Sequence, residues 1–310
     1  MQSKIKVAII GLDTSHAVAM PKLIQDPETP PENRISGLQV TRCLRFPSPF
    51  QSTEGMDVRQ KYLERIGVTV TENFAEAVAD CDALMLNIND PALHLEYFTR
   101  CAALGKRIFL DKPFADTLDN ACRIDAVARA HRTGYFTSSS LRFAADVTAA
   151  VAGKTFTAAH LWGPVGTAAS GSSIIWYGVH TFEMLQKILG RGASQVMSVA
   201  DPDGWQCLVT YPDGRRGVVE LSRSRRDYGG MLRDTDGRET LFHESCPRPL
   251  YYMMLEQVEK FFRTGTVPVA IEDSLEVMAM LEAADKSALS RRPEAVFPDN
   301  SGDIHHIDEQ

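Results

Sequence analysis

The chain has 310 residues, of which 44% are hydrophobic and 24% charged, and its formal net charge is −7. The composition is ordinary for a globular protein, and the length is sufficient for two domains. The acidic balance argues against nucleic acid and against an anionic membrane surface as the main partner. No apolar run approaches the roughly 20 residues that cross a bilayer. The six cysteines form no CxxC pair, which favours a reducing, cytoplasmic setting.

In the first half of the chain, short apolar runs alternate with stretches of helical spacing. Strands are predicted over residues 5–10, 38–46, 68–70, 83–87, 107–110 and 135–138. Helices are predicted over residues 17–24, 57–66, 73–79, 91–104 and 117–130. Strands that alternate with helices indicate right-handed βαβ units around a parallel sheet.

The second half of the chain changes to short strands separated by turn signals. Its strands are predicted over residues 154–162, 195–200, 205–211, 217–224, 228–234 and 239–242. Its helices are predicted over residues 174–189, 250–262 and 274–287. Asp213-Gly214 and Asp236-Gly237 lie between strand-like runs, which is typical of hairpins. A mostly antiparallel sheet is therefore predicted to follow the parallel one.

The clearest chemical motif is Asp111-Lys112-Pro113, which follows the apolar strand 107–110. Open parallel sheets hold their ligands beyond the carboxyl ends of their strands. Proline after lysine removes a backbone donor and makes a cis peptide bond less costly, so Lys112 is expected in a fixed, turned-out position. A solvated lysine beside a turn proline explains the same residues equally well.

Two segments resemble the motifs of one family. DKPFA resembles the Glu-Lys-Pro signature of the Gfo/Idh/MocA oxidoreductases, with Asp111 in place of the glutamate. WYGVHTFE, at residues 176–183, resembles the Asp-x-Gly-x-His-x-x-Asp segment of the same family. Gly178 and His180 match that segment, Glu183 stands in for its last acid, and a tryptophan replaces its first.

The resemblance implies an α/β fold with two domains. A Rossmann-like dinucleotide-binding domain with a parallel sheet is expected over residues 1–142. An α+β domain with a mostly antiparallel open sheet, for substrate binding and oligomerisation, is expected over residues 143–310. The closing helix, about residues 272–289, is expected to pack back on the first domain. The resemblance also implies a homo-oligomer with a small-molecule substrate.

The resemblance further implies NAD or NADP as cofactor. The G-x-G-x-x-G turn of dinucleotide-binding domains corresponds here to GLDTSH, which keeps only its first glycine. Asp13, Thr14 or Ser15 is expected to cap the following helix. Arginines end the second strand, where one would suit the 2′-phosphate of NADP; a solvated arginine is an equal alternative. The predicted cofactor-binding residues are Gly11, Asp13, Thr14, Ser15, Arg45, Asn87, Asn89, Pro91, His94, Asp111 and Lys112.

The stretch NINDP, followed by His94, resembles the family's segment after the fourth strand, which lines the cofactor channel. An ordinary helix start explains it as well, with Asn89 or Asp90 as the cap and Pro91 in the first helical position.

The chemistry of oxidising a carbinol requires a hydride path and a group that exchanges the hydroxyl proton near neutral pH. Histidine has a suitable ordinary pKa, so His180 is predicted as the acid/base. The ammonium of Lys112 would stabilise developing negative charge and keep the imidazole neutral. Arg142, Trp176 and Tyr177 are predicted, with His180, to contact the substrate. No metal site is predicted, because Asp13, His16 and His180 match no metal-ligand spacing.

Two classes of function remain open from the sequence. The first is an NAD(P)-dependent oxidoreductase that acts on a sugar, cyclitol or related polyol, and the retained Lys112, Pro113 and His180 favour it. The second is a family member that has lost ordinary redox turnover and uses its pocket for a non-redox or ligand-sensing role. The loss of two glycines and of the first acid of the histidine motif favours this second class.

Overall fold

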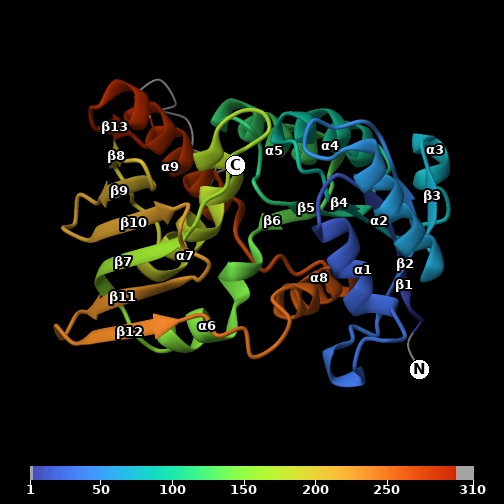
Figure 1. Cartoon of the computed structure of the whole chain (residues 1–310), viewed down its shortest axis with the longest axis horizontal. Coiled ribbons are helices and arrows are strands. Elements are labelled where there is room, and N and C mark those ends of the chain that lie inside the picture. The colour runs from blue at the N-terminus through green and yellow to red at the C-terminus, as the bar shows by residue number, and fades with distance from the viewer. Residues whose placement is uncertain (1–2, 298–310) are drawn as a thin grey trace.

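The computed structural model describes residues 3–297, and its first half forms a sheet with helices on both faces (Figure 1). In this described part, six parallel strands lie in the order β3-β2-β1-β4-β5-β6. They are β1 (Ile5–Ile10), β2 (Leu38–Leu44), β3 (Thr69–Thr71), β4 (Ala83–Leu86), β5 (Arg107–Asp111) and β6 (Tyr135–Ser138). The helices of this half are α1 (His16–Gln25), α2 (Thr53–Arg65), α3 (Phe74–Ala77), α4 (His94–Ala102) and α5 (Leu118–His131). Single 3₁₀ turns occupy η1 (Pro31–Asn33) and η2 (Pro91–Leu93). The predicted parallel sheet is confirmed.

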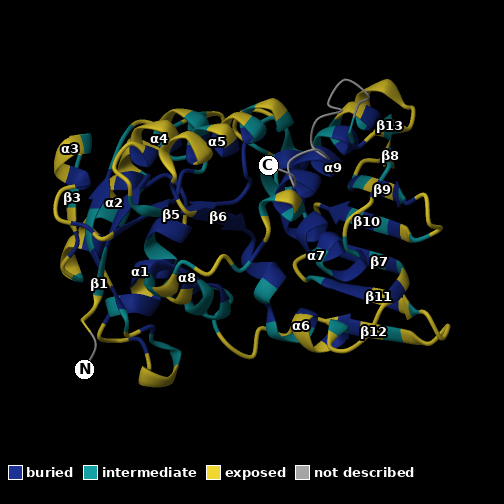
Figure 2. Ribbon diagram, turned by 180° about the vertical axis from the view of Figure 1, so that it is seen from behind, coloured by how far each residue is buried: buried dark blue, intermediate teal, exposed yellow. Residues whose placement is uncertain are grey.

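Alternate residues of the strands belong to two hydrophobic cores, one on each face of the first sheet, because successive side chains of a strand point to opposite faces. Ala8 and Ile10 of β1 belong to the core that includes residues of α4 and α5. Val7 and Ile9 belong to the core that includes residues of α1 and of α8 (Tyr252–Thr264). Figure 2 shows β5 and β6 as mostly buried. Since α8 comes late in the chain, the C-terminal half returns to complete the core on the α1 side of the first sheet.

The second sheet is mixed and has seven strands in the described residues, in the order β12-β11-β7-β10-β9-β8-β13. They are β7 (Phe156–Pro164), β8 (Gln195–Ala200), β9 (Gly204–Thr210), β10 (Arg216–Ser222), β11 (Gly229–Asp234), β12 (Glu239–His243) and β13 (Glu294–Ala295). β7 and β10 pair in parallel, and every other pair is antiparallel. The prediction of a mostly antiparallel sheet is therefore confirmed. The chain passes from β7 through a helix to β8, which runs in the same direction as β7. It then reverses twice, through β9 to β10, so β10 lies parallel to β7.

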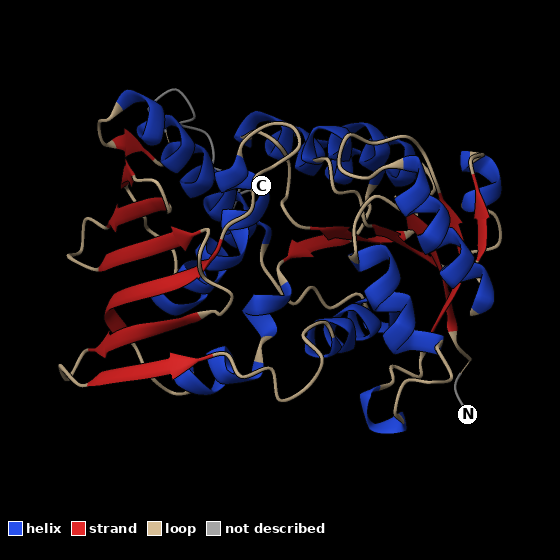
Figure 3. Ribbon diagram, viewed as in Figure 1, coloured by secondary structure: helices blue, strands red, loops and turns tan. Residues whose placement is uncertain are grey.

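Helices α7 (Val179–Leu189) and α9 (Ile271–Ser290) pack on the face of this sheet that lies toward the first sheet (Figure 3). A π-helical turn, η4 (Ile174–Gly178), leads into α7. The 3₁₀ turn η3 (Ser140–Phe143) and helix α6 (Ala145–Val151) connect the two halves. No helix of the described residues is long and apolar enough to cross a membrane.

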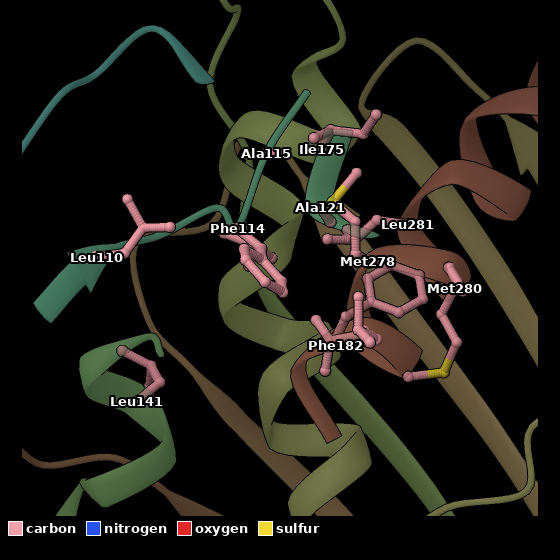
Figure 4. Packing of buried hydrophobic residues seen from close by; sticks show 14 of the residues in the cluster. Leu110, Phe114, Ala115, Ala121, Leu141, Ile175, Phe182, Met278, Met280 and Leu281 are labelled. Atoms are coloured by element: carbon pink, nitrogen blue, oxygen red, sulfur yellow. The ribbon is translucent and has the colours of Figure 1, made fainter. Parts of the chain in front are cut away.

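One continuous apolar core joins the two halves. Helix α9 packs against α5 and β6 of the first half as well as against α7. Phe114, which follows β5, lies beside Met278 and Leu281 of α9 (Figure 4). The carboxyl end of β5 and the start of α7 are consequently anchored to the same buried cluster, which fixes the two elements that carry the family-like motifs.

Helix caps explain where several predicted boundaries shift. The Ser52 side chain accepts a hydrogen bond from the Gly55 amide at 3.1 Å, so α2 begins four residues before its predicted start at 57. Asp90 accepts from the Ala92 amide at 3.1 Å, with Pro91 in the first position of η2. Asp90 is thus the cap of that segment, one of the two alternatives that the sequence left open.

Candidate active site

Lys112 lies directly beyond the carboxyl end of β5 and is only 6% exposed. Its peptide bond to Pro113 is cis, and its amide donates to its neighbour Asp111 Oδ1 at 2.9 Å. Its Nζ lies 6.0 Å from the ring centre of Trp176 and 5.9 Å from that of Tyr177. A lysine from the first sheet therefore meets the π-helical turn that leads into α7.

His180, the second residue of α7, approaches the same place from the other half and is 6% exposed. Its Nδ1 shares a hydrogen bond of 2.6 Å with Ser139 Oγ, at the end of β6. Burial lowers the pKa of His180 well below its ordinary value, and the nearby positive charges of Lys112 and His16 lower it further. Burial also lowers the pKa of Lys112, against the attraction of Asp111. The Lys112–His180 pair is thus brought together, with the imidazole neutral at pH 7.

A second histidine stands at this site. His16 Nδ1 lies 2.5 Å from Asp111 Oδ2, and both side chains are buried. Burial raises the pKa of Asp111, but the charge and hydrogen bond of His16 and the charge of Lys112 outweigh it, so the net shift is downward. The Tyr251 ring lies over His16, with ring centres 4.8 Å apart. His16, which stands at the third glycine position of the G-x-G-x-x-G pattern, was not predicted as a catalytic residue. No group of side chains that could hold a metal ion is found among the described residues.

Two tyrosine rings pack against His180. The Tyr177 ring packs edge-on against His180 with centres 5.2 Å apart, and the Tyr228 ring lies 5.9 Å from His180. Burial and the neighbouring Tyr177 raise the pKa of Tyr228 well above its ordinary value, so its hydroxyl stays protonated. The sequence analysis missed Tyr228 and Tyr251. They occupy loops before β11 and α8, where no motif marks them.

The loop after β1 is built around the carboxylate of Asp13, which is 1% exposed. Asp13 Oδ2 accepts from Ser48 Oγ at 2.6 Å, and Oδ1 accepts from the Asn89 amide at 2.9 Å. Asn89 Oδ1 in turn accepts from Trp176 Nε1 at 2.9 Å. These bonds tie the loops that follow β1, β2 and β4 to the second half of the chain.

The expected helix cap in this loop is only partly formed by side chains. Ser15 occupies the cap position of α1, and its backbone oxygen, rather than its side chain, accepts from the Val18 and Ala19 amides. Thr14 Oγ1 accepts from the His16 amide at 3.2 Å.

Several other predicted cofactor residues use their polar atoms in contacts within the first half. Arg45 pairs with Asp57 at 2.6 Å. Asn87 is fully buried and donates to Met20 Sδ at 3.2 Å. His94 is also fully buried, and its two ring nitrogens lie 3.1 and 2.9 Å from backbone oxygens.

Arg142, predicted to contact the substrate, lies in a buried ionic network. Its guanidinium donates to Glu183 Oε2 at 3.0 Å and to Gln186 Oε1 at 2.5 Å, and it reaches Asp273 of α9 at 3.4 Å. Burial raises the pKa of Glu183, and Arg142 opposes that rise. The network joins η3, α7 and α9.

The strand order of the first sheet, with helices on both faces and polar groups beyond the strand ends, defines a dinucleotide-binding α/β domain. Residues 5–138 match the model of the oxidoreductase family with an NAD-binding Rossmann fold, GFO_IDH_MocA. The chain therefore carries the NAD-binding Rossmann domain of the Gfo/Idh/MocA oxidoreductase family.

Solved structures share the fold along nearly the whole chain. GenD2 from gentamicin A biosynthesis, in complex with NAD, is 16% identical, with 96% of this chain and 98% of that chain covered and a TM-score of 0.78. Scyllo-inositol dehydrogenase from Lactobacillus casei is 15% identical, with 96% and 99% covered and a TM-score of 0.76. An oxidoreductase from Agrobacterium radiobacter, in complex with NAD+, L-tartaric acid and magnesium, is 16% identical, with 95% and 99% covered and a TM-score of 0.73. No curated protein matches the sequence.

The loop after β1 keeps two features that fit a dinucleotide. Gly11 has φ of +106°, and a Cβ there would lie 2.3 Å from the Asn87 carbonyl oxygen, so the tight turn is retained. The first turn of α1 carries no acidic residue, which leaves its positive end suited to a diphosphate. The Asp13 carboxylate is turned inward, but its negative charge still opposes a diphosphate.

Proposed function

We propose that the protein is an NAD(P)-dependent oxidoreductase that acts on the CH–OH group of a sugar, cyclitol or related polyol. The observation that carries the proposal is that Lys112 and His180 both lie beside the Tyr177 ring, where burial and the charge of Lys112 lower the pKa of His180. The family assignment of residues 5–138 supports a nicotinamide cofactor. The whole-chain likeness to an inositol dehydrogenase supports a polyol as the substrate class.

In this mechanism, His180 holds the hydroxyl of the substrate and takes its proton at Nε2, since Nδ1 is engaged with Ser139. The imidazole is ready to accept because its pKa lies well below the ordinary value, through burial and the charge of Lys112. Lys112 Nζ stabilises the negative charge that develops on the same oxygen. The Trp176 and Tyr177 rings beside Nζ exclude water and orient the substrate.

The cofactor, when bound, accepts or donates the hydride. The residues that would hold it are Gly11 and Ser15 at the diphosphate and Asn89 and Lys112 nearer the nicotinamide. Because Asp13 and His16 replace two glycines, we expect weaker dinucleotide binding than in a standard Rossmann domain. We expect the protein to work in the cytoplasm as a homo-oligomer.

The test measures the turnover of the wild type and of His180→Ala with a panel of inositols, hexoses and tartrate. The absorbance of NAD(P)H reports the turnover. We expect the variant to lose turnover by about 10²–10⁴-fold, which is the usual contribution of a general acid/base, while its circular dichroism stays unchanged. His160→Ala is the matched control, because that histidine lies on β7 with 42% of its side chain exposed. Full activity of His180→Ala would contradict the mechanism.

A non-redox or ligand-sensing role is the second candidate, and the buried Asp13 carboxylate favours it. Asp13 binds Ser48 and Asn89, so it draws together the three loops between which a dinucleotide would pass. Calorimetric titration with NADH and NADPH separates the two candidates. Binding below about 1 μM, a free energy near −8 kcal/mol, would remove the second candidate. Absence of binding at millimolar dinucleotide would remove the first.

A further inference from the structure

The proposed reaction leaves unused the pair formed by His16 and Asp111. These residues lie 95 positions apart in the chain, and the fold brings His16 Nδ1 to 2.5 Å from Asp111 Oδ2. An ionised carboxylate can only accept a hydrogen bond. Burial would raise the pKa of Asp111, but the hydrogen bond shared with His16 and the charge of Lys112 lower it, so the carboxylate stays ionised. When the His16 ring acts as a base, Nδ1 therefore keeps its proton toward Asp111, and the lone pair lies on Nε2.

His16 Nε2 is available for chemistry. No described residue forms a hydrogen bond with this atom, and the atom is not completely buried. The His16 side chain keeps 9% of its surface exposed. A proton taken up at Nε2 would create an imidazolium directly against a carboxylate, which stabilises the charged product.

His180 differs from His16 in the partner that sets its tautomer and in the charge that lies beside its protonated form. Its Nδ1 partner is the Ser139 hydroxyl, which can donate or accept, so the bond does not fix the tautomer. Protonation of His180 would also place a cation beside Lys112. The site thus holds two imidazoles with unlike partners and one ammonium between the two halves of the chain.

Two acid/base groups exceed what carbinol oxidation needs. Such a set is suited to removing a proton from carbon, because one base takes the carbon-bound proton while an ammonium stabilises the enolate oxygen. We propose that this site catalyses proton exchange at a carbon next to the carbonyl group of a polyol-derived ketone, with His16 as the base that Asp111 orients. The proposal rests on the proposed function for its substrate class only and needs no cofactor.

The step balances without an oxidant or a reductant. The Cα–H bond of the ketone breaks, its electron pair becomes the C=C bond of the enolate, and the carbonyl π pair moves to oxygen. The proton goes to His16 Nε2, and Lys112 Nζ stabilises the oxygen. The reverse transfer returns a proton, and a solvent deuteron replaces the original hydrogen after exchange at Nε2.

The test is proton NMR in D₂O without added dinucleotide, using 2-keto-myo-inositol and dihydroxyacetone as probes. We expect the protein to speed loss of the α-proton signals at least about 100-fold over buffer, within the range of acid/base catalysis. His16→Gln should remove this acceleration, although the glutamine amide can still donate to Asp111 and preserve the fold. Asp111→Asn should slow exchange by about 10³-fold or more, because an amide no longer fixes the reactive tautomer.

His243→Gln is the matched control, because that histidine lies on β12 with 59% of its side chain exposed, and it should exchange as the wild type does. Absence of enzyme-dependent exchange with both probes would overturn the proposal, and so would unchanged exchange in folded His16→Gln. NAD(P)H formation is measured separately. Proton exchange without NAD(P)H formation would therefore support this proposal and contradict the proposed redox function. NAD(P)H formation without proton exchange would support the redox function and contradict this proposal.

Discussion

Replacing Asp13 by asparagine should tighten dinucleotide binding, because it removes a negative charge from the loop that would face the diphosphate. The interaction of two unit charges is about 332/(εr) kcal/mol. At roughly 6 Å, an effective dielectric constant of about 20 gives about 3 kcal/mol, and a value of about 80 gives about 0.7 kcal/mol. These energies correspond to about 100-fold and about threefold in affinity.

The surroundings of Asp13 indicate that the gain in NADH affinity lies between threefold and 100-fold. Arg59 Nη1 donates to the Leu12 carbonyl at 2.9 Å, beside Asp13, and its positive charge offsets part of the repulsion. Asparagine retains an acceptor for the Asn89 amide and offers a donor to Ser48 Oγ. We therefore expect about tenfold tighter NADH binding and a loss of stability near 1 kcal/mol, the scale of one hydrogen bond.

The assay is calorimetric titration of NADH into the wild type and Asp13→Asn, paired with urea unfolding. Asp26→Asn is the matched control, since this fully buried carboxylate lies at the other end of α1, where it binds Tyr62 Oη at 2.5 Å. The control should lose stability without any gain in affinity. If folded Asp13→Asn binds NADH no better than the wild type, the electrostatic reasoning about this loop fails.

Three further outcomes are expected. Gly11→Ala should lower the free energy of unfolding by at least about 2 kcal/mol in urea titration, because its Cβ would meet the Asn87 carbonyl at 2.3 Å; a neutral effect would contradict the tight turn. Arg142→Ala should cost about 3–5 kcal/mol in the same assay by leaving Glu183 buried without its partner, and a loss below about 1 kcal/mol would contradict the network. Stability should fall as pH drops below 6.5, the ordinary pKa of histidine, because burial and Lys112 lower the pKa of His180 and the unfolded chain then binds more protons; His180→Gln should flatten this slope between pH 5 and 7.5, and an unaltered slope would speak against it.

The sequence was sufficient for the order of most strands and helices. β1 and β6 begin and end where their apolar runs predict, because short buried strands are bounded by turn residues. Boundaries were less accurate where a cap decides them, as at Ser52 before α2. Helix α6 was not predicted, since its seven residues are too few to show helical periodicity.

The site was predictable where a motif marks it and not where the fold assembles it. The residues flanking a strand end signalled Lys112, and the spacing from Gly178 signalled His180. The contact between His16 and Asp111 joins residues far apart in the chain, and no local pattern reports such a pair. For Arg142, the sequence revealed the residue but not its partners, because Glu183 and Asp273 reach it only after α7 and α9 have packed.

The most direct test of the central claim is an NMR titration of the His180 imidazole in the wild type and in Lys112→Met. If the lysine beyond β5 and the imidazole on α7 belong to one site, loss of the ammonium removes a charge that disfavours the imidazolium. The pKa of His180 should then move upward toward its ordinary value, although burial still holds it below that value. A pKa that does not change in folded Lys112→Met would show that the two side chains do not act on each other, and the proposed mechanism would have to be abandoned.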